Sequence, residues 1–242
     1  MWTSTASGVV TTTDPGRILL LGSAHVVDLA GPIRERLTAL PLQAVALELD
    51  PSRVAVLEQS VAASGAKRAS VPPLIRLWAA IQRRLGAELG QGAGGEMRAA
   101  ARFAHERQLP IFLIDDPFDQ TVRRLLSSLS VFERVRLLAG AVIGLVIPAR
   151  TVKRELDQYS ETPAEFADQI RSSFPTVARV LIDERNEHMA ARLEAIWHRG
   201  IRQVAVVVGD AHVAGLADAL RRRQLPVETV SLGELRAPVT AP

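Results

Sequence analysis

Residues 204–216 read VAVVVGDAHVAGL, an apolar run that ends in a glycine and is followed, three positions after that glycine, by His212. Residues 18–29 read ILLLGSAHVVDL and repeat this order, with His25 in the same place. A continuous apolar run that stops at a glycine is typical of a parallel strand buried on both faces. Both stretches therefore predict a buried strand with a histidine just beyond its carboxyl end. In open α/β sheets ligands and catalytic groups gather at that edge, so the two imidazoles meet only if the two strands lie close together in one sheet.

Three other segments have the composition of strands, and helical spacing fills most of the chain between the strands. Short connections between alternating strands and helices favour a parallel sheet. The stretch from 119 to 200 has no convincing strand and carries a long helical pattern over 175–198. We therefore expect an α/β fold with a mostly parallel central sheet flanked by helices, and with a helical insertion before the last strands. The predicted strands are 17–21, 44–49, 110–115, 203–208 and 227–230, and a further helix is predicted over 214–223.

The chain of 242 residues is long enough for one substantial core, and no low-complexity linker divides it. We expect a single domain over residues 17–234 that includes the helical insertion at 119–200. A flexible N-terminal tail (1–16) and a C-terminal tail (235–242) flank this domain.

The composition excludes several classes of protein. Hydrophobic residues make up 48% and charged residues 23%, as in ordinary globular proteins, and cysteine is absent, which rules out disulfides and thiolate chemistry. The formal net charge of +3 is diffuse and argues against a nucleic-acid partner. The most apolar stretch, 137–149, is shorter than the roughly twenty residues that cross a bilayer. The first sixteen residues lack the pattern of a secretory signal, so we expect a soluble, cytoplasmic protein without a membrane span.

Glu48 lies near the carboxyl end of the second predicted strand, whose other residues are apolar. An ionised carboxylate in such a strand costs several kcal/mol unless it is paired or ligated. One interpretation pairs Glu48 with Arg53 or another arginine in a structural salt bridge. The other places it beside His25 and His212, because two imidazoles and one carboxylate match a common hydrolytic site for a divalent ion.

The glycines at 22 and 209 allow two uses. Glycine lets the backbone leave the strand with a positive φ, and it lets a metal or substrate approach the main chain closely. Neither glycine belongs to a phosphate-binding loop, because the G-x-G-x-x-G and G-x-x-x-x-G-K patterns are absent.

The chain resembles the TraB/PrgY family of pheromone-shutdown proteins, which is related to the Tiki peptidases and more distantly to the erythromycin esterases. The matching segments are spread over most of the chain, and the pair of Gly-x-x-His motifs with the glutamate between them is the most specific element. These segments are 21–26 (LGSAHV), 47–50 (LELD) with Arg53, 95–100 (GEMRAA), 183–186 (DERN) followed by 189–190 (MA), and 207–213 (VVGDAHV).

The resemblance implies different chemistry in different branches. In the Tiki branch it implies manganese- or cobalt-dependent peptidase chemistry centred on these motifs. In the esterase branch similar His and Glu positions activate water without a required metal. The matched segments also imply functional roles for Glu96 and Arg185, whose alternatives are helix capping and a solvated charged face. We expect His188, three residues further on, at the surface.

One family element is altered in this chain. Relatives usually carry Asp-Arg-Pro after the third strand and a downstream Thr-x-x-Arg. Here the sequence is Asp115-Asp116-Pro117, while Thr121 and Arg124 remain. The resemblance thus implies a changed substrate corner, in which Arg124 is either a substrate clamp or a structural salt-bridge partner.

Three functions follow from these residues and this resemblance. The first is a divalent-metal-dependent, peptidase-like hydrolase, in which His25 and His212 hold Mn, Co or Zn and Glu48 is the third ligand or the general base. In this hydrolase Arg53 or Arg185 stabilises the oxyanion. The second is a metal-independent, esterase-like hydrolase, and the third is a non-catalytic protein that sequesters a peptide or signal. The expected substrate is a peptide or small acyl compound, and the helical insertion either roofs the site or forms a homodimer interface.

Overall fold

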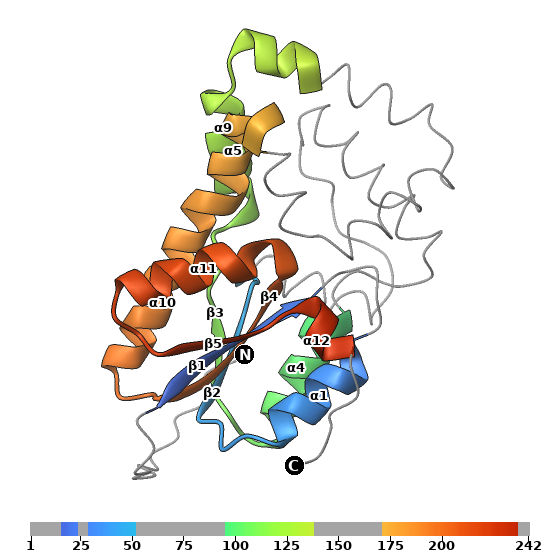
Figure 1. Ribbon diagram of the computed structural model, residues 1–242, viewed down its shortest axis with the longest axis vertical. Helices are drawn as coiled ribbons and strands as arrows, with labels where there is room; N and C mark the ends of the chain where they lie inside the picture. The colour runs from blue at the N-terminus through green and yellow to red at the C-terminus, as the bar shows by residue number, and fades with distance from the viewer. Residues whose placement is uncertain (1–15, 24–28, 52–94, 138–170, 237–242) are drawn as a thin grey trace.

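The computed structural model describes residues 16–23, 29–51, 95–137 and 171–236. They form a five-stranded sheet in the order β3-β2-β4-β1-β5, and each pair of neighbouring strands is parallel (Figure 1). This confirms the predicted α/β class. The strands are β1 (Arg17–Ser23), β2 (Ala44–Leu47), β3 (Ile111–Leu113), β4 (Gln203–Gly209) and β5 (Val227–Val230).

The two apolar runs that carry the repeated motif are neighbours in the sheet. β1 pairs with β4 over its whole length, and the register places Gly22 opposite Val208 and Ser23 opposite Gly209. The two strands thus end side by side at the same edge, although most of the chain separates them. The two motifs can meet only if their strands lie close together in one sheet, and this condition is confirmed. His25 itself lies outside the described residues.

Two helical layers cover the sheet (Figure 1). Successive strand residues alternate between the layers, so that Leu20 and Val206 belong to one apolar cluster and Leu21 and Val207 to the other. One layer consists of α10 (Glu184–His198) and α11 (Asp210–Arg222), and the other of α1 (Ala30–Thr38), α4 (Gly95–Glu106) and α12 (Leu232–Arg236).

The long helix predicted over 175–198 is present, but it changes its winding. It consists of α9 (Pro175–Ala178), a π-helical segment η1 (Arg179–Asp183) and α10. Its first part lies beside α5 (Phe118–Ser128), beyond the edge of the sheet (Figure 1). Residues 138–170 of the predicted helical insertion lie outside the described residues. No helix in the described ranges is long and apolar enough to cross a membrane.

The helix predicted over 214–223 begins four residues earlier, at Asp210. Gly209 is extended at its start (φ −59°, ψ 140°), and the Asp210 carboxylate in the first turn complements the helix dipole. His212 therefore lies in the first turn of α11 and not in a loop after the strand. This places the imidazole at the fixed end of a packed helix.

The central strand β4 gives the first testable prediction. Val206→Ala removes two methyl groups from a side chain that is fully buried, so we expect it to lower the free energy of unfolding by about 2 kcal/mol. The matched control is Val131→Ala, because the Val131 side chain is 76% exposed. Urea unfolding measures both, and equal losses in the two variants contradict the described core.

Candidate functional site

Glu48 follows β2 directly and is held at the edge of the sheet. Its amide donates to Val207 O (3.0 Å), which continues the β2–β4 ladder by one residue. The carboxylate is buried, and its Oε2 accepts a hydrogen bond from the amide of Gly209 (2.6 Å). The other oxygen, Oε1, accepts from Arg185 Nη2 (2.5 Å). Glu48 thus joins the ends of two strands to helix α10.

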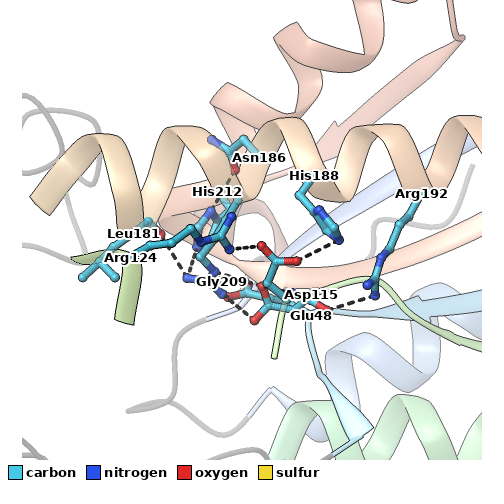
Figure 2. A network of polar contacts seen from close by, with 11 residues as sticks. Glu48, Asp115, Arg124, Leu181, Asn186, His188, Arg192, Gly209 and His212 are labelled. Atoms are coloured by element: carbon cyan, nitrogen blue, oxygen red, sulfur yellow. Dashed lines mark hydrogen bonds and ion pairs between the residues drawn. The ribbon is translucent and has the colours of Figure 1, made fainter. Parts of the chain in front are cut away.

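Arg185 of α10 is the centre of a polar network. Figure 2 labels the partners that it contacts, which are Glu48, Asp115, Leu181 and His212. It forms a bidentate pair with Asp115, in which Nε donates to Oδ1 (2.9 Å) and Nη2 to Oδ2 (2.8 Å). Its Nη1 donates to the carbonyl of Leu181 (3.0 Å), which lies in the π-helical segment. Only 12% of the Arg185 side chain is exposed. A planar guanidinium suits this task, since its donors can serve two carboxylates at once.

His212 faces the same arginine. Its Nε2 lies 3.0 Å from Arg185 Nη1 and 3.4 Å from Glu48 Oε1, and its Nδ1 lies 2.8 Å from Asn186 Oδ1 (Figure 2). An arginine can only donate and an amide oxygen can only accept, so Nε2 carries the lone pair and Nδ1 the hydrogen. These contacts favour a neutral imidazole whose lone pair points toward the two charged groups.

The charges set the protonation states of the network. Burial by itself raises the pKa of the Glu48 carboxyl, but the electrostatic effects of His212 and Arg185 and the hydrogen bonds from Gly209 and Arg185 outweigh it and lower that pKa to about 2. Burial likewise acts to lower the pKa of Arg185, but Glu48 and Asp115 raise it above its ordinary value. Glu48 and Arg185 are therefore both ionised at neutral pH.

A second group of charges leads from this centre toward the surface. Asp116 is buried and pairs with Arg124 of α5, and its Oδ1 lies 2.9 Å from His188 Nε2. The Arg124 side chain is 44% exposed. Burial lowers the pKa of His188, against the opposing effect of Asp116. His188, expected at the surface, is thus half-buried against Asp116. In the described structure Arg124 forms a salt bridge, one of its two predicted roles.

The two motif glycines let other side chains approach the strand ends closely, and neither has an unusual backbone conformation. Gly209 has a φ of −59°, and Gly22 is not among the described glycines with a positive φ, so the expectation of a positive φ is wrong. A Cβ on Gly22 would collide with the Asp210 carboxylate, and one on Gly209 would lie 3.3 Å from Glu48 Oε2. The glycines therefore admit side chains of the protein itself to the strand ends.

The remaining predicted residues differ in their placement. Arg53, like His25, lies outside the described residues. Glu96 is buried in the first turn of α4, in the helical layer opposite α10 and α11. Sequence reasoning missed Asp115 and Asn186 as members of the network. Asp115 and Asn186 lie next to Asp116 and Arg185, which the sequence analysis singled out. The sequence pattern did not indicate which residues Asp115 and Asn186 would contact.

Of the three predicted metal ligands, Glu48 and His212 lie within the described residues and His25 does not. Glu48 Oε1 and His212 Nε2 face each other, but both accept hydrogen bonds from Arg185 as they stand. Within the described ranges, no group of three or more His, Cys, Asp or Glu side chains is arranged to hold an ion. The described donors therefore do not fit an ion unless the guanidinium moves away.

The fold and this network define an α/β protein with a buried polar centre at the carboxyl edge of a parallel sheet, where such proteins place their sites. The chain belongs to the TraB/PrgY/gumN family, whose model matches residues 9–229. It is 25% identical over 217 residues to the uncharacterized protein MJ1365 of Methanocaldococcus jannaschii, a match that covers 85% of this chain and 53% of that protein. The chain thus spans about half the length of this curated relative.

The lowered pKa of Glu48 predicts a pH dependence of stability. A carboxyl whose folded pKa is depressed stabilises the fold above its ordinary pKa of 4.5, and this contribution disappears as the pH falls toward about 2. We expect the advantage of the wild type over Glu48→Gln in urea unfolding to shrink by about 3 kcal/mol between pH 5 and pH 2.

Glu106→Gln is the matched control, since Glu106 also pairs with an arginine but its side chain is 52% exposed. Its difference from the wild type should change little over the same pH range. A Glu48→Gln difference that is independent of pH contradicts an ionised Glu48 in the folded protein.

Proposed function

We propose that this chain is a hydrolase of peptide or other acyl bonds, with its reaction centre at Glu48, Arg185 and His212. The observation that carries the proposal is the meeting of an imidazole lone pair, a guanidinium and a carboxylate at the carboxyl edge of the sheet. A base and an oxyanion partner within hydrogen-bond reach of one another are what acyl transfer to water requires.

His212 is the proposed base. With its hydrogen on Nδ1, its Nε2 can take a proton from a water molecule as the water oxygen attacks the acyl carbon. The same nitrogen then returns the proton to the leaving group. The contact between Nε2 and Arg185 Nη1 has to open to admit this water.

Arg185 is the proposed oxyanion partner, because its guanidinium lies beside Nε2 and keeps its charge at every relevant pH. Glu48 and Asp115 fix its orientation. A carboxyl with a pKa of about 2 is a poor base at neutral pH, so we assign Glu48 a role in holding and charging the centre, and not the role of general base.

The metal-dependent form of this hydrolase is the alternative proposal. The 3.4 Å between Glu48 Oε1 and His212 Nε2 matches the spacing of two ligands of one ion at bond lengths of about 2.1 Å. Arg185 contacts both atoms, so it would have to move away before an ion could bind. In this alternative a manganese, cobalt or zinc ion would be held by Glu48, His212 and His25. When bound, such an ion supplies an activated water and a polarised carbonyl.

The proposal predicts loss of activity on two substitutions. We expect His212→Gln to lower the hydrolysis of p-nitrophenyl acetate or alanine p-nitroanilide by about 10² to 10⁴, because the base is lost. Arg185→Lys should lower it by about 10² to 10³, because an ammonium cannot reproduce the guanidinium contacts. Arg34→Lys is the matched control, because Arg34 forms an exposed ion pair with Glu106, and it should keep full activity. Wild-type rates in both site variants contradict the proposal.

Chelation separates the two forms of the hydrolase. We expect the activity of the purified protein to survive prolonged treatment with EDTA, since the proposed base and oxyanion partner are both side chains. The measurement is the rate before and after treatment, together with the metal content of the protein. Activity that is lost and then restored by manganese, cobalt or zinc replaces this form by the metal-dependent alternative.

A further inference from the structure

Two consecutive residues of α10 contact the two nitrogens of one imidazole. Arg185 Nη1 lies 3.0 Å from Nε2 of His212, and Asn186 Oδ1 lies 2.8 Å from its Nδ1 (Figure 2). Here one short stretch of helix holds the ring from both sides.

Asn186 occupies a site that is shaped for it. Its side chain is buried with 3% exposure and packs over Gly215 of α11, one turn beyond His212. A Cβ on Gly215 would come closer to Asn186 Nδ2 than the 3.0 Å that real Cβ contacts respect. A glycine inside a helix is less favourable than alanine by roughly 1 kcal/mol. The fold therefore keeps an unfavourable residue where the Asn186 amide needs space.

The chemistry of the partners leaves one arrangement of hydrogens. A neutral imidazole has one donor and one acceptor nitrogen, and Arg185 can only donate, so Nε2 must accept. Nδ1 then carries the hydrogen, and the Asn186 amide must present its oxygen and not its nitrogen. The opposite tautomer would set two donors against each other at Nε2 and leave the buried Oδ1 without a hydrogen bond from the ring.

We propose that Asn186 is a positioning residue that locks His212 in the tautomer with the hydrogen on Nδ1 and the lone pair on Nε2. Gly215 makes this possible because it leaves room for the Asn186 amide. This inference rests on the proposed function, because a fixed tautomer is useful only if the Nε2 lone pair takes part in the reaction. That lone pair faces Glu48 and Arg185. The inference holds for both forms of the hydrolase, since a base and a metal ligand at Nε2 both need the hydrogen on the other nitrogen.

The direct test reads the tautomer of the wild-type protein and needs no substrate. Histidine-selective ¹⁵N labelling and long-range ¹H–¹⁵N correlation spectra at pH 7 distinguish the two neutral forms, and His212→Gln assigns the signals. We expect His212 to be neutral with its hydrogen on Nδ1. A hydrogen on Nε2, or a rapidly exchanging mixture of both forms, overturns the proposal.

Three variants test the mechanism of the lock. Asn186→Ala should convert the single tautomer into a mixture, and Gly215→Ala should do the same by displacing the amide. Asn186→Asp should keep the hydrogen on Nδ1, because a carboxylate also accepts. The matched control is Gly31→Ala, since a Cβ on Gly31 meets no atom within 4 Å, and it should leave the spectrum unchanged. A single Nδ1–H form in both Asn186→Ala and Gly215→Ala overturns the assigned role.

The kinetic consequence is separable from the tautomer. With p-nitrophenyl acetate as probe, Asn186→Ala should lower kcat by about a hundredfold and leave KM nearly unchanged, while Asn186→Asp retains most of kcat. A locked tautomer in a wild-type protein that hydrolyses neither probe refutes the proposed function and leaves this inference intact. A mobile tautomer in an active enzyme refutes this inference alone.

Discussion

The structure depends on one buried guanidinium. Arg185 reaches from α10 to the ends of β2 and β3, where it meets Glu48 and Asp115, and it touches His212 of α11. Removing one partner would leave an uncompensated charge in a nearly dry place, which is strongly destabilising. Replacing the whole group by apolar side chains is often neutral or stabilising in proteins. Stability alone therefore does not explain why the chain keeps a charged network here, and the reaction centre that we propose would explain it.

Much of the fold follows from simple patterns. The apolar runs of β1 and β4 predict two buried parallel strands, and the shared motif requires them to be neighbours, which the sheet order confirms. Glu48 stands out because a lone carboxylate in an apolar strand needs a partner. The sequence offers Arg53 or another arginine for this role, and in the described structure Arg185, 137 residues away, pairs with it.

The rest of the site depends on packing that a sequence pattern does not contain. The partnership of Asn186 with His212 follows from how α10 lies against α11, and from the space left by Gly215. The bidentate hold of Asp115 follows from the position of β3 at the edge of the sheet. A positive φ would explain the motif glycines locally, but that explanation is wrong. The glycines instead allow side chains from elsewhere in the fold to approach closely.

Glu48 and Arg185 form one buried ion pair, so their contributions to stability should depend on each other. A double-mutant cycle with Glu48→Gln, Arg185→Met and the combined variant measures this directly through the free energy of unfolding at pH 7. We expect a coupling energy of about 2 kcal/mol or more, because the two groups form a buried charged pair. Losses that add to within about 0.5 kcal/mol would contradict it, because independent sites behave in that way.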